Sequence, residues 1–93
     1  MIYIITYNIN TSIRDYSDFY EAIKNSCQGY YHALESTWFV SSHLGCNVKL
    51  MTNHLRSFLY PGDTLFIAEF TRDTNVDGWI TKDFWQWYNN NIR

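Results

Sequence analysis

The stretch "MIYIITYNIN", residues 1–10, opens the chain with the pattern of a β-strand. Over residues 2–7 successive side chains point to opposite faces of an extended backbone. Ile2, Ile4 and Thr6 share one face, and Tyr3, Ile5 and Tyr7 share the other. Both sets are largely apolar, so we expect a central strand that is covered on both faces. Asn8 interrupts the apolar run and begins a polar loop over residues 8–14.

Two helices are predicted downstream from apolar side chains that recur every three to four residues. The first spans about residues 16–27, with Asp15 or Ser17 as its cap and Gly29 as its stop. The second begins after Asn47, a favourable cap, and ends at the turn over residues 61–63. Its apolar stripe consists of Val48, Met51, Thr52, Leu55, Phe58 and Leu59.

Three further strands are predicted around these helices. The stretch "GYYHALESTWFVSSHLG", residues 29–45, lacks helical periodicity and is rich in aromatic and β-branched residues. We interpret it as two strands, over residues 30–34 and 37–41, joined by a turn at Glu35-Ser36; one long strand is the alternative. "TLFIAEF", residues 64–70, is the last strand. A polar loop over residues 71–78 follows, and Thr81 caps a short final helix.

The resulting order, β-α-β-β-α-β with a helical tail, predicts the α+β class and a ferredoxin-like split βαβ arrangement. Two helices would cover one face of a four-stranded antiparallel sheet within a single domain, residues 1–93, in which residues 71–93 form the loop and the C-terminal helical tail. The opposite face would be bare in a monomer. Large exposed apolar patches usually mark interfaces. We therefore expect a homodimer, or a face that the C-terminal segment covers.

Composition limits the classes of function. Of the 93 residues 46% are hydrophobic and 19% aromatic, more aromatic material than one small core needs, which favours an interface or a binding surface. The net charge is −2, and the seven Lys and Arg residues are dispersed, which disfavours strong nucleic-acid binding. The N-terminal apolar stretch is too short for a signal peptide, and no run has the length of a membrane span. We expect a cytoplasmic protein whose Cys27 and Cys46 remain thiols.

Several stretches together resemble a known group. "YIITYNI", then a helix, then "YYHALESTWFV", and later "DTLFIAEF" with a Trp-containing tail, resemble small bacterial and phage proteins known as SinR-like. The run from Leu34 to Trp38 is the most specific part of the resemblance, which covers most of the chain. These proteins are in turn similar in layout to the CRISPR adaptation subunit, the second Cas protein, and to VapD-like toxins.

The resemblance implies a ferredoxin-like homodimer, and in some relatives a metal-dependent nuclease. In that wider group an Asp follows the Tyr at the end of the first strand, and two such residues share a divalent metal across the dimer axis. The matching residue here is Asn8. An amide carbonyl supplies a dipole where a carboxylate supplies a charge, so an Asn8 pair is poorly suited to hold Mg²⁺. We predict no metal site and no cofactor.

The candidate binding residues are Asn8, Asn10, Arg14, His32, Glu35, Ser36, Thr37 and Trp85. Asn8 either ends the strand as an Asx-type turn residue or offers hydrogen bonds in a cleft at a dimer axis. His32, like His43 and His54, has no second histidine at helical metal-binding spacing and is best interpreted as structural. Ser36 and Thr37 form a hydroxyl-bearing turn, and no partner base for a nucleophilic serine is visible. Of the tail aromatics, Trp85 and Trp87 cannot both face inward on one helix.

These observations favour a non-catalytic homodimeric interaction protein that binds a partner protein or a nucleotide-type ligand. A phage or mobile-element setting, for example counter-defence, would suit the resemblance. Two alternatives stay open: a divergent metal-dependent nuclease with Asn8 in place of Asp, and nucleic-acid binding without cleavage.

Overall fold

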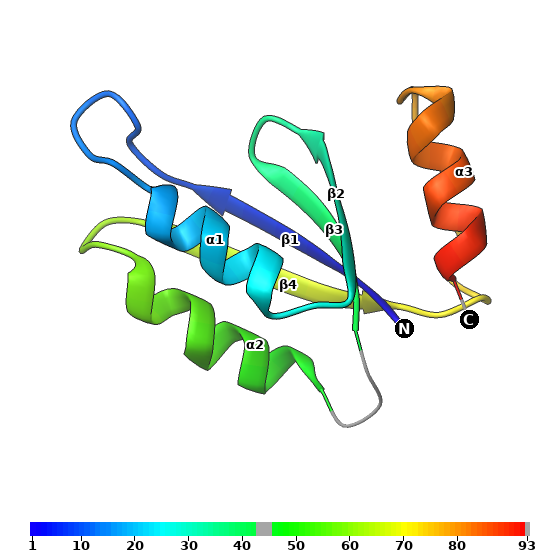
Figure 1. Ribbon diagram of the computed structural model, residues 1–93, viewed down its shortest axis with the longest axis horizontal. Coiled ribbons are helices and arrows are strands. Elements are labelled where there is room, and N and C mark those ends of the chain that lie inside the picture. Colours follow the sequence, from blue (N-terminus) through cyan, green and yellow to red (C-terminus); the bar gives the residue numbers. More distant parts are fainter. Residues whose placement is uncertain (43–45, 93) are drawn as a thin grey trace.

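The computed structural model, which describes residues 1–42 and 46–92, is an α+β domain built on one antiparallel sheet (Figure 1). Its strands are β1 (Ile2–Asn8), β2 (Gly29–Leu34), β3 (Thr37–Ser41) and β4 (Thr64–Phe70), in the order β2-β3-β1-β4. Its helices are α1 (Ser17–Asn25), α2 (Val48–Leu55) and α3 (Lys82–Asn91), and a 3₁₀ turn, η1 (Arg56–Phe58), follows α2. The predicted class and four-stranded antiparallel sheet are confirmed, and the arrangement is compatible with a ferredoxin-like fold.

The central position predicted for the first strand is confirmed. β1 pairs with β3 on one side and with β4 on the other, through registers such as Ile5 with Trp38 and Ile5 with Ile67. The turn at residues 35–36 separates β2 from β3, so the alternative of one long strand is wrong. Asn47 Oδ1 accepts a 2.9 Å hydrogen bond from the Leu50 amide and caps α2, as predicted.

The first helix is shorter than the predicted span of residues 16–27. At its C-terminal end Ser26 Oγ and Cys27 Sγ both donate to the carbonyl of Ile23, 2.9 and 3.3 Å away. Side chains that bond a backbone carbonyl in this way compete with continuation of the helix. At the other end Tyr16 leaves helical geometry, with φ −110° and ψ 19°, and Asp15 Oδ1 accepts a 2.9 Å hydrogen bond from the Ser17 amide.

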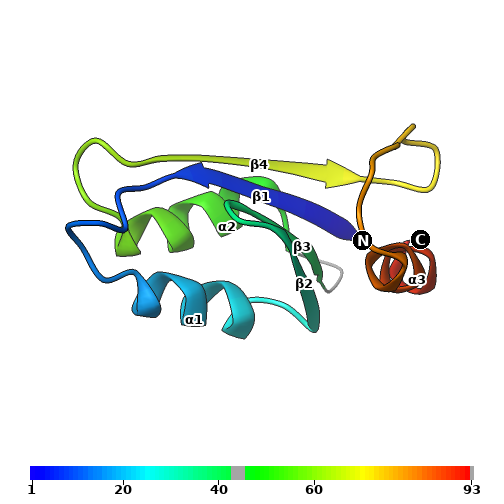
Figure 2. The same ribbon diagram turned by 90° about the horizontal axis from the view of Figure 1, so that it is seen from above.

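The main core lies between the sheet and the layer formed by α1 and α2, which Figure 2 shows together on one side of β1 and β4. Its fully buried side chains include Tyr3, Ile5, Phe19, Ile23 and Leu55. In α2, Met51 and Leu55 carry the buried face of the predicted stripe, whereas Val48 at its first turn is exposed.

A second, smaller core forms where α3 meets the opposite face of the sheet. Phe84 and Tyr88 of α3 pack against Ile2 and Phe39. The C-terminal segment therefore covers one end of the face that the sequence predicts to be bare in a monomer. Phe66, on β4, lies on the same face by register, paired with Thr6, and stays 64% exposed.

Candidate functional site

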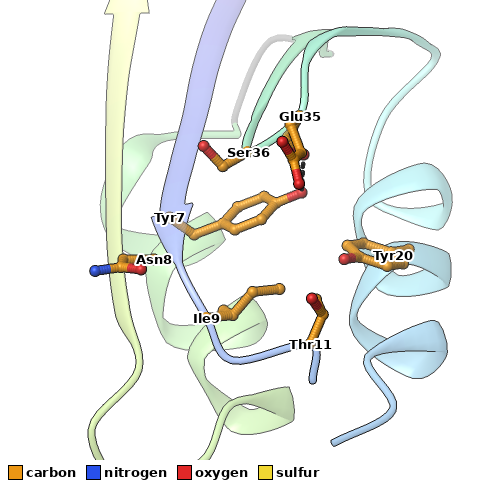
Figure 3. Close-up of a pocket in the computed structure, with 7 residues that line it drawn as sticks. All are labelled: Tyr7, Asn8, Ile9, Thr11, Tyr20, Glu35 and Ser36. Carbon is orange, nitrogen blue, oxygen red and sulfur yellow. Dashed lines mark hydrogen bonds between the residues drawn. The ribbon is translucent and has the colours of Figure 1, made fainter. Parts of the chain in front are cut away.

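A pocket of about 270 Å³ lies at the end of β1 (Figure 3), and we call it the terminal pocket. Its lining comes from β1 and the following loop, from α1 and from the β2–β3 turn: Tyr7, Asn8, Ile9, Thr11, Tyr20, Glu35 and Ser36. It thus brings together three of the predicted binding residues, Asn8, Glu35 and Ser36, which are 28 positions apart at most. The four lining residues that sequence reasoning missed are Tyr7, Ile9, Thr11 and Tyr20. Of these, Tyr20 reaches the pocket only because α1 packs near the end of β1.

Asn8 forms part of the pocket rim, but its amide points away from the rings of Tyr7 and Tyr20 (Figure 3). The alternation of a strand is the cause, because Asn8 lies on the face opposite to Tyr7. Its register partner is Thr64 on β4. The side chain on which the sequence argument concentrated therefore faces a shallow depression on the other side of the sheet, beside Thr6 and Phe66.

Tyr7 is the best anchored residue of the terminal pocket. Its hydroxyl accepts a 2.9 Å hydrogen bond from Trp38 Nε1 and donates a long one, 3.5 Å, to the carbonyl of Glu35. The Tyr7 amide donates to the carbonyl of Ser36 at 3.2 Å. Burial raises the pKa of the Tyr7 phenol to about 12. The phenol therefore stays neutral at physiological pH and acts as a hydrogen-bonding group.

His32 takes a structural position beside this pocket. Its ring stacks on Trp38, with centroids 4.2 Å apart and planes 13° apart, and Nε2 lies 2.9 Å from the carbonyl oxygen of Glu35. Thr37 is buried on the opposite face of the sheet, where its hydroxyl lies 3.2 Å from that of Thr6. Neither residue lines the terminal pocket. His43, also considered from the sequence, lies outside the described residues.

Asn10 and Arg14 belong to the neighbouring loop and hold its shape. Asn10 Oδ1 accepts from the amide and the hydroxyl of Ser12, at 3.3 and 2.6 Å, which is an Asx turn. The Arg14 guanidinium lies 4.3 Å from the centre of the Tyr60 ring, a cation–π contact. Neither side chain lines the terminal pocket.

A hydrogen-bonded clasp, formed by Tyr16 and Asp63, ties this loop to the turn before β4. The Tyr16 hydroxyl donates to both carboxylate oxygens of Asp63, at 2.8 and 2.9 Å, and Asp63 also accepts from the Tyr60 amide at 2.9 Å. Burial, followed by the neighbouring Asp63, raises the pKa of Tyr16. The sequence indicates Asp63 only as part of the turn that ends the second helix.

The second concave surface is an apolar hollow of about 280 Å³ between the sheet, the loop before α3 and α3 itself. We define it by six of its lining residues: Ile4, Phe39, Phe70, Val76, Ile80 and Trp85. The predicted residue Trp85 is therefore a half-buried wall of this hollow, and Trp87 is half-buried as well. The fully exposed indole is that of Trp79, in the adjoining loop, which the sequence offers only as one of several tail aromatics.

Ionisable groups are dispersed. Within residues 1–42 and 46–92, no three His, Cys, Asp or Glu side chains gather in a group that could hold a metal ion. Cys27 and Cys46 are free thiols that pack against the main core, and burial, with a smaller effect of Cys46, raises the pKa of Cys27 to about 11. This effect indicates that the two thiols lie near each other. In the part of the chain that the structure describes, no helix is long and apolar enough to cross a membrane.

No family model matches the chain, and comparison with curated proteins finds no significant match. The resemblance to SinR-like proteins therefore stays a prediction.

Proposed function

We propose that this protein is a non-catalytic interaction protein with a ferredoxin-like fold that acts as a homodimer. The observation that carries the proposal is the full exposure of Trp79 next to the apolar hollow. Tryptophan is among the residues most enriched in the energetic centres of protein interfaces. An indole left in water beside an unfilled apolar hollow indicates a surface that another chain covers.

The occupant that we propose is a second copy of the chain. Trp79 and the hollow lie on adjoining segments of one surface, so each of two copies can insert its Trp79 into the hollow of the other. Such a reciprocal contact is closed by a two-fold axis and needs no third chain. A cavity of about 150 Å³ already accommodates benzene. The hollow, at about 280 Å³, has room for the two rings of an indole.

Two Trp79 insertions by themselves only offset the cost of association, so a stable dimer must bury further surface. A Trp side chain buries at least about 150 Å², which contributes roughly 4 kcal/mol at about 25 cal/mol per Å². Two reciprocal insertions supply about 8 kcal/mol, the same order as the entropic cost of association. We therefore expect further exposed apolar surface on this side of the sheet, above all Phe66, to be buried as well.

The terminal pocket supports a non-catalytic role. Tyr7 is neutral, and His32 is held between Trp38 and a backbone carbonyl, so neither side chain is placed as a general base for the Ser36 hydroxyl. The amide of Asn8 points out of the pocket (Figure 3). These positions favour recognition of a partner group over nuclease chemistry.

Size-exclusion chromatography with light scattering tests the dimer. The chain has a mass of 11.2 kDa, and we expect twice that mass at tens of micromolar protein. Trp79→Ala should give the monomer, and because Trp79 is fully exposed the variant should fold normally. Leu50→Ala is the matched control, since Leu50 is exposed on α2, in the helix layer. A wild-type monomer at these concentrations would contradict the proposal.

A cleavage assay tests the non-catalytic part separately. Labelled RNA and double-stranded DNA are incubated with the purified protein and Mg²⁺ or Mn²⁺, and we expect both substrates to stay intact. Cleavage that disappears in Asn8→Ala would instead establish the nuclease.

A further inference from the structure

We infer that the terminal pocket binds a guanidinium or alkylammonium group. The inference rests on the proposed role as an interaction protein and adds the chemical class of the group that is recognised. It is independent of Trp79 and the hollow.

Aromatic rings and oxygen atoms form the walls of the pocket. Tyr7 and Tyr20 lie with ring centroids 6.3 Å apart and planes 43° apart. In Figure 3 the hydroxyls of Tyr20 and Thr11 point into the space between α1 and the end of β1. Because Tyr7 is buried and Tyr20 stacks on Trp38, the groups offered to a cation are the hydroxyl oxygens, which accept hydrogen bonds from its N–H groups.

The charge of the pocket selects the sign of the ligand. Glu35 is the one charged residue among the seven that line it. The nearest basic residues along the chain are engaged elsewhere, since Arg14 lies over Tyr60 and Lys24 pairs with Glu21 at 3.7 Å. A phosphate would meet a carboxylate without a compensating cation, whereas a guanidinium would be attracted to it. The terminal pocket is therefore unsuited to the phosphate end of a nucleotide.

The size of the pocket fits a cationic head with an alkyl stem. At about 270 Å³ it exceeds the space that an ammonium ion needs, and the Ile9 side chain extends into it as an apolar surface (Figure 3). Long basic side chains bury their methylene stems on apolar surface in this way. A free alkylguanidinium and the side chain of an arginine share this chemistry.

Titrations monitored by NMR chemical shifts of the full chain test the inference. Ethylguanidinium is the free small cation, and a short neutral-capped peptide with one arginine is the protein-derived source. The same peptide with citrulline in place of arginine keeps the shape and removes the charge. We expect the amides of Tyr7, Glu35 and Ser36 to shift with one or both guanidinium probes and not with citrulline. A stronger response to the peptide would identify a protein partner as the source.

Paired variants locate the charge that is responsible. Glu35→Gln should weaken binding about five- to tenfold, the range of a hydrogen-bonded ion pair that is partly exposed to water. Asp18→Asn, which removes an equal charge from an exposed position of α1 outside the pocket, should leave binding unchanged. Two results with the designed probes would overturn the inference: equal binding of the citrulline peptide, or an unchanged affinity in Glu35→Gln. It would also be overturned if the pocket preferred phosphate or a nucleoside, or if no amide shifted at about 1 mM probe, a roughly 20-fold excess over the protein.

The same titration on Trp79→Ala separates this inference from the proposed homodimer. If the wild-type chain is a dimer, and Trp79→Ala is a monomer that still binds the guanidinium, both hold. If the wild-type chain is a monomer and still binds, the dimer is wrong and the pocket assignment stands.

Discussion

Trp38 Nε1 donates a 2.9 Å hydrogen bond to the Tyr7 hydroxyl in the interior of the protein. The bond joins β3 to β1, next to each other in the sheet, on the face that α1 and α2 cover. Tyr7 also lines the terminal pocket, and Trp38 stacks on His32, which lies beside that pocket. One buried polar pair therefore fixes the core and the pocket wall together.

Tyr7→Phe should lower the free energy of unfolding by about 1–3 kcal/mol. The substitution keeps the ring and leaves the buried indole N–H of Trp38 without its acceptor, and the cost of a buried unsatisfied donor has that magnitude. Urea denaturation monitored by circular dichroism measures it. Tyr30→Phe is the control, because Tyr30 is 45% exposed. Equal stability of Tyr7→Phe and the control would show that this bond contributes nothing.

Stability should fall at alkaline pH, between about pH 10 and 12. Burial raises the pKa of both Tyr3 and Tyr7 from 10.0 to about 12 in the folded state. The unfolded chain loses these protons first, so the stabilisation is complete below pH 10 and is lost as pH rises through the folded pKa. Denaturation at pH 8, 10 and 11 measures the slope, which should be shallower in Tyr7→Phe. A stability that does not change between pH 8 and 11 would contradict the burial of both phenols.

Asp63→Asn should destabilise the clasp formed by Tyr16 and Asp63 by about 1–3 kcal/mol. Asp63 accepts from the Tyr16 hydroxyl and from the Tyr60 amide, and hydrogen bonds to charged groups contribute more than neutral ones. Asp73→Asn, an exposed aspartate of the loop after β4, is the charge-matched control. Thermal unfolding gives the stability, and amide hydrogen exchange of Tyr60 should accelerate in Asp63→Asn alone. Unchanged protection of that amide would rule out the clasp.

Asn47→Ala should cost about 1 kcal/mol, because Asn47 Oδ1 caps α2 through the Leu50 amide. Asn53→Ala, at an exposed position in the same helix, should be neutral or slightly stabilising because alanine is the better helix former. Chemical denaturation of both variants makes the comparison. A larger loss in Asn53→Ala than in Asn47→Ala would reverse this assignment.

Much of the fold is predictable from local patterns. The alternation in residues 2–7 and 64–70, the turn at Glu35-Ser36 and the cap at Asn47 are short-range signals, and the structure has each of them where the pattern indicates. The helix α1 ends at Asn25, two residues before the predicted end, because the side chains of Ser26 and Cys27 donate to the Ile23 carbonyl. Apolar periodicity does not reveal such bonds.

The candidate site was predictable only in part. The turn residues Glu35 and Ser36 do lie in one pocket with Asn8. Strand alternation alone turns the Asn8 side chain away from Tyr7 and could have been predicted, whereas the contribution of Tyr20 depends on the packing of α1. Trp79 stands in a loop whose path depends on tertiary contacts of α3. The sequence groups Trp79 with the other tail aromatics, and no local pattern indicates that Trp79, before the last helix, is the exposed indole.

The most direct test of the central claim is an intermolecular NOE measurement on a mixed dimer of labelled and unlabelled chains. The account predicts NOEs from the Trp79 indole protons of one chain to Ile80 and Phe70, in the hollow of the other. A dimer whose Trp79 indole shows no intermolecular NOE to these residues would contradict it.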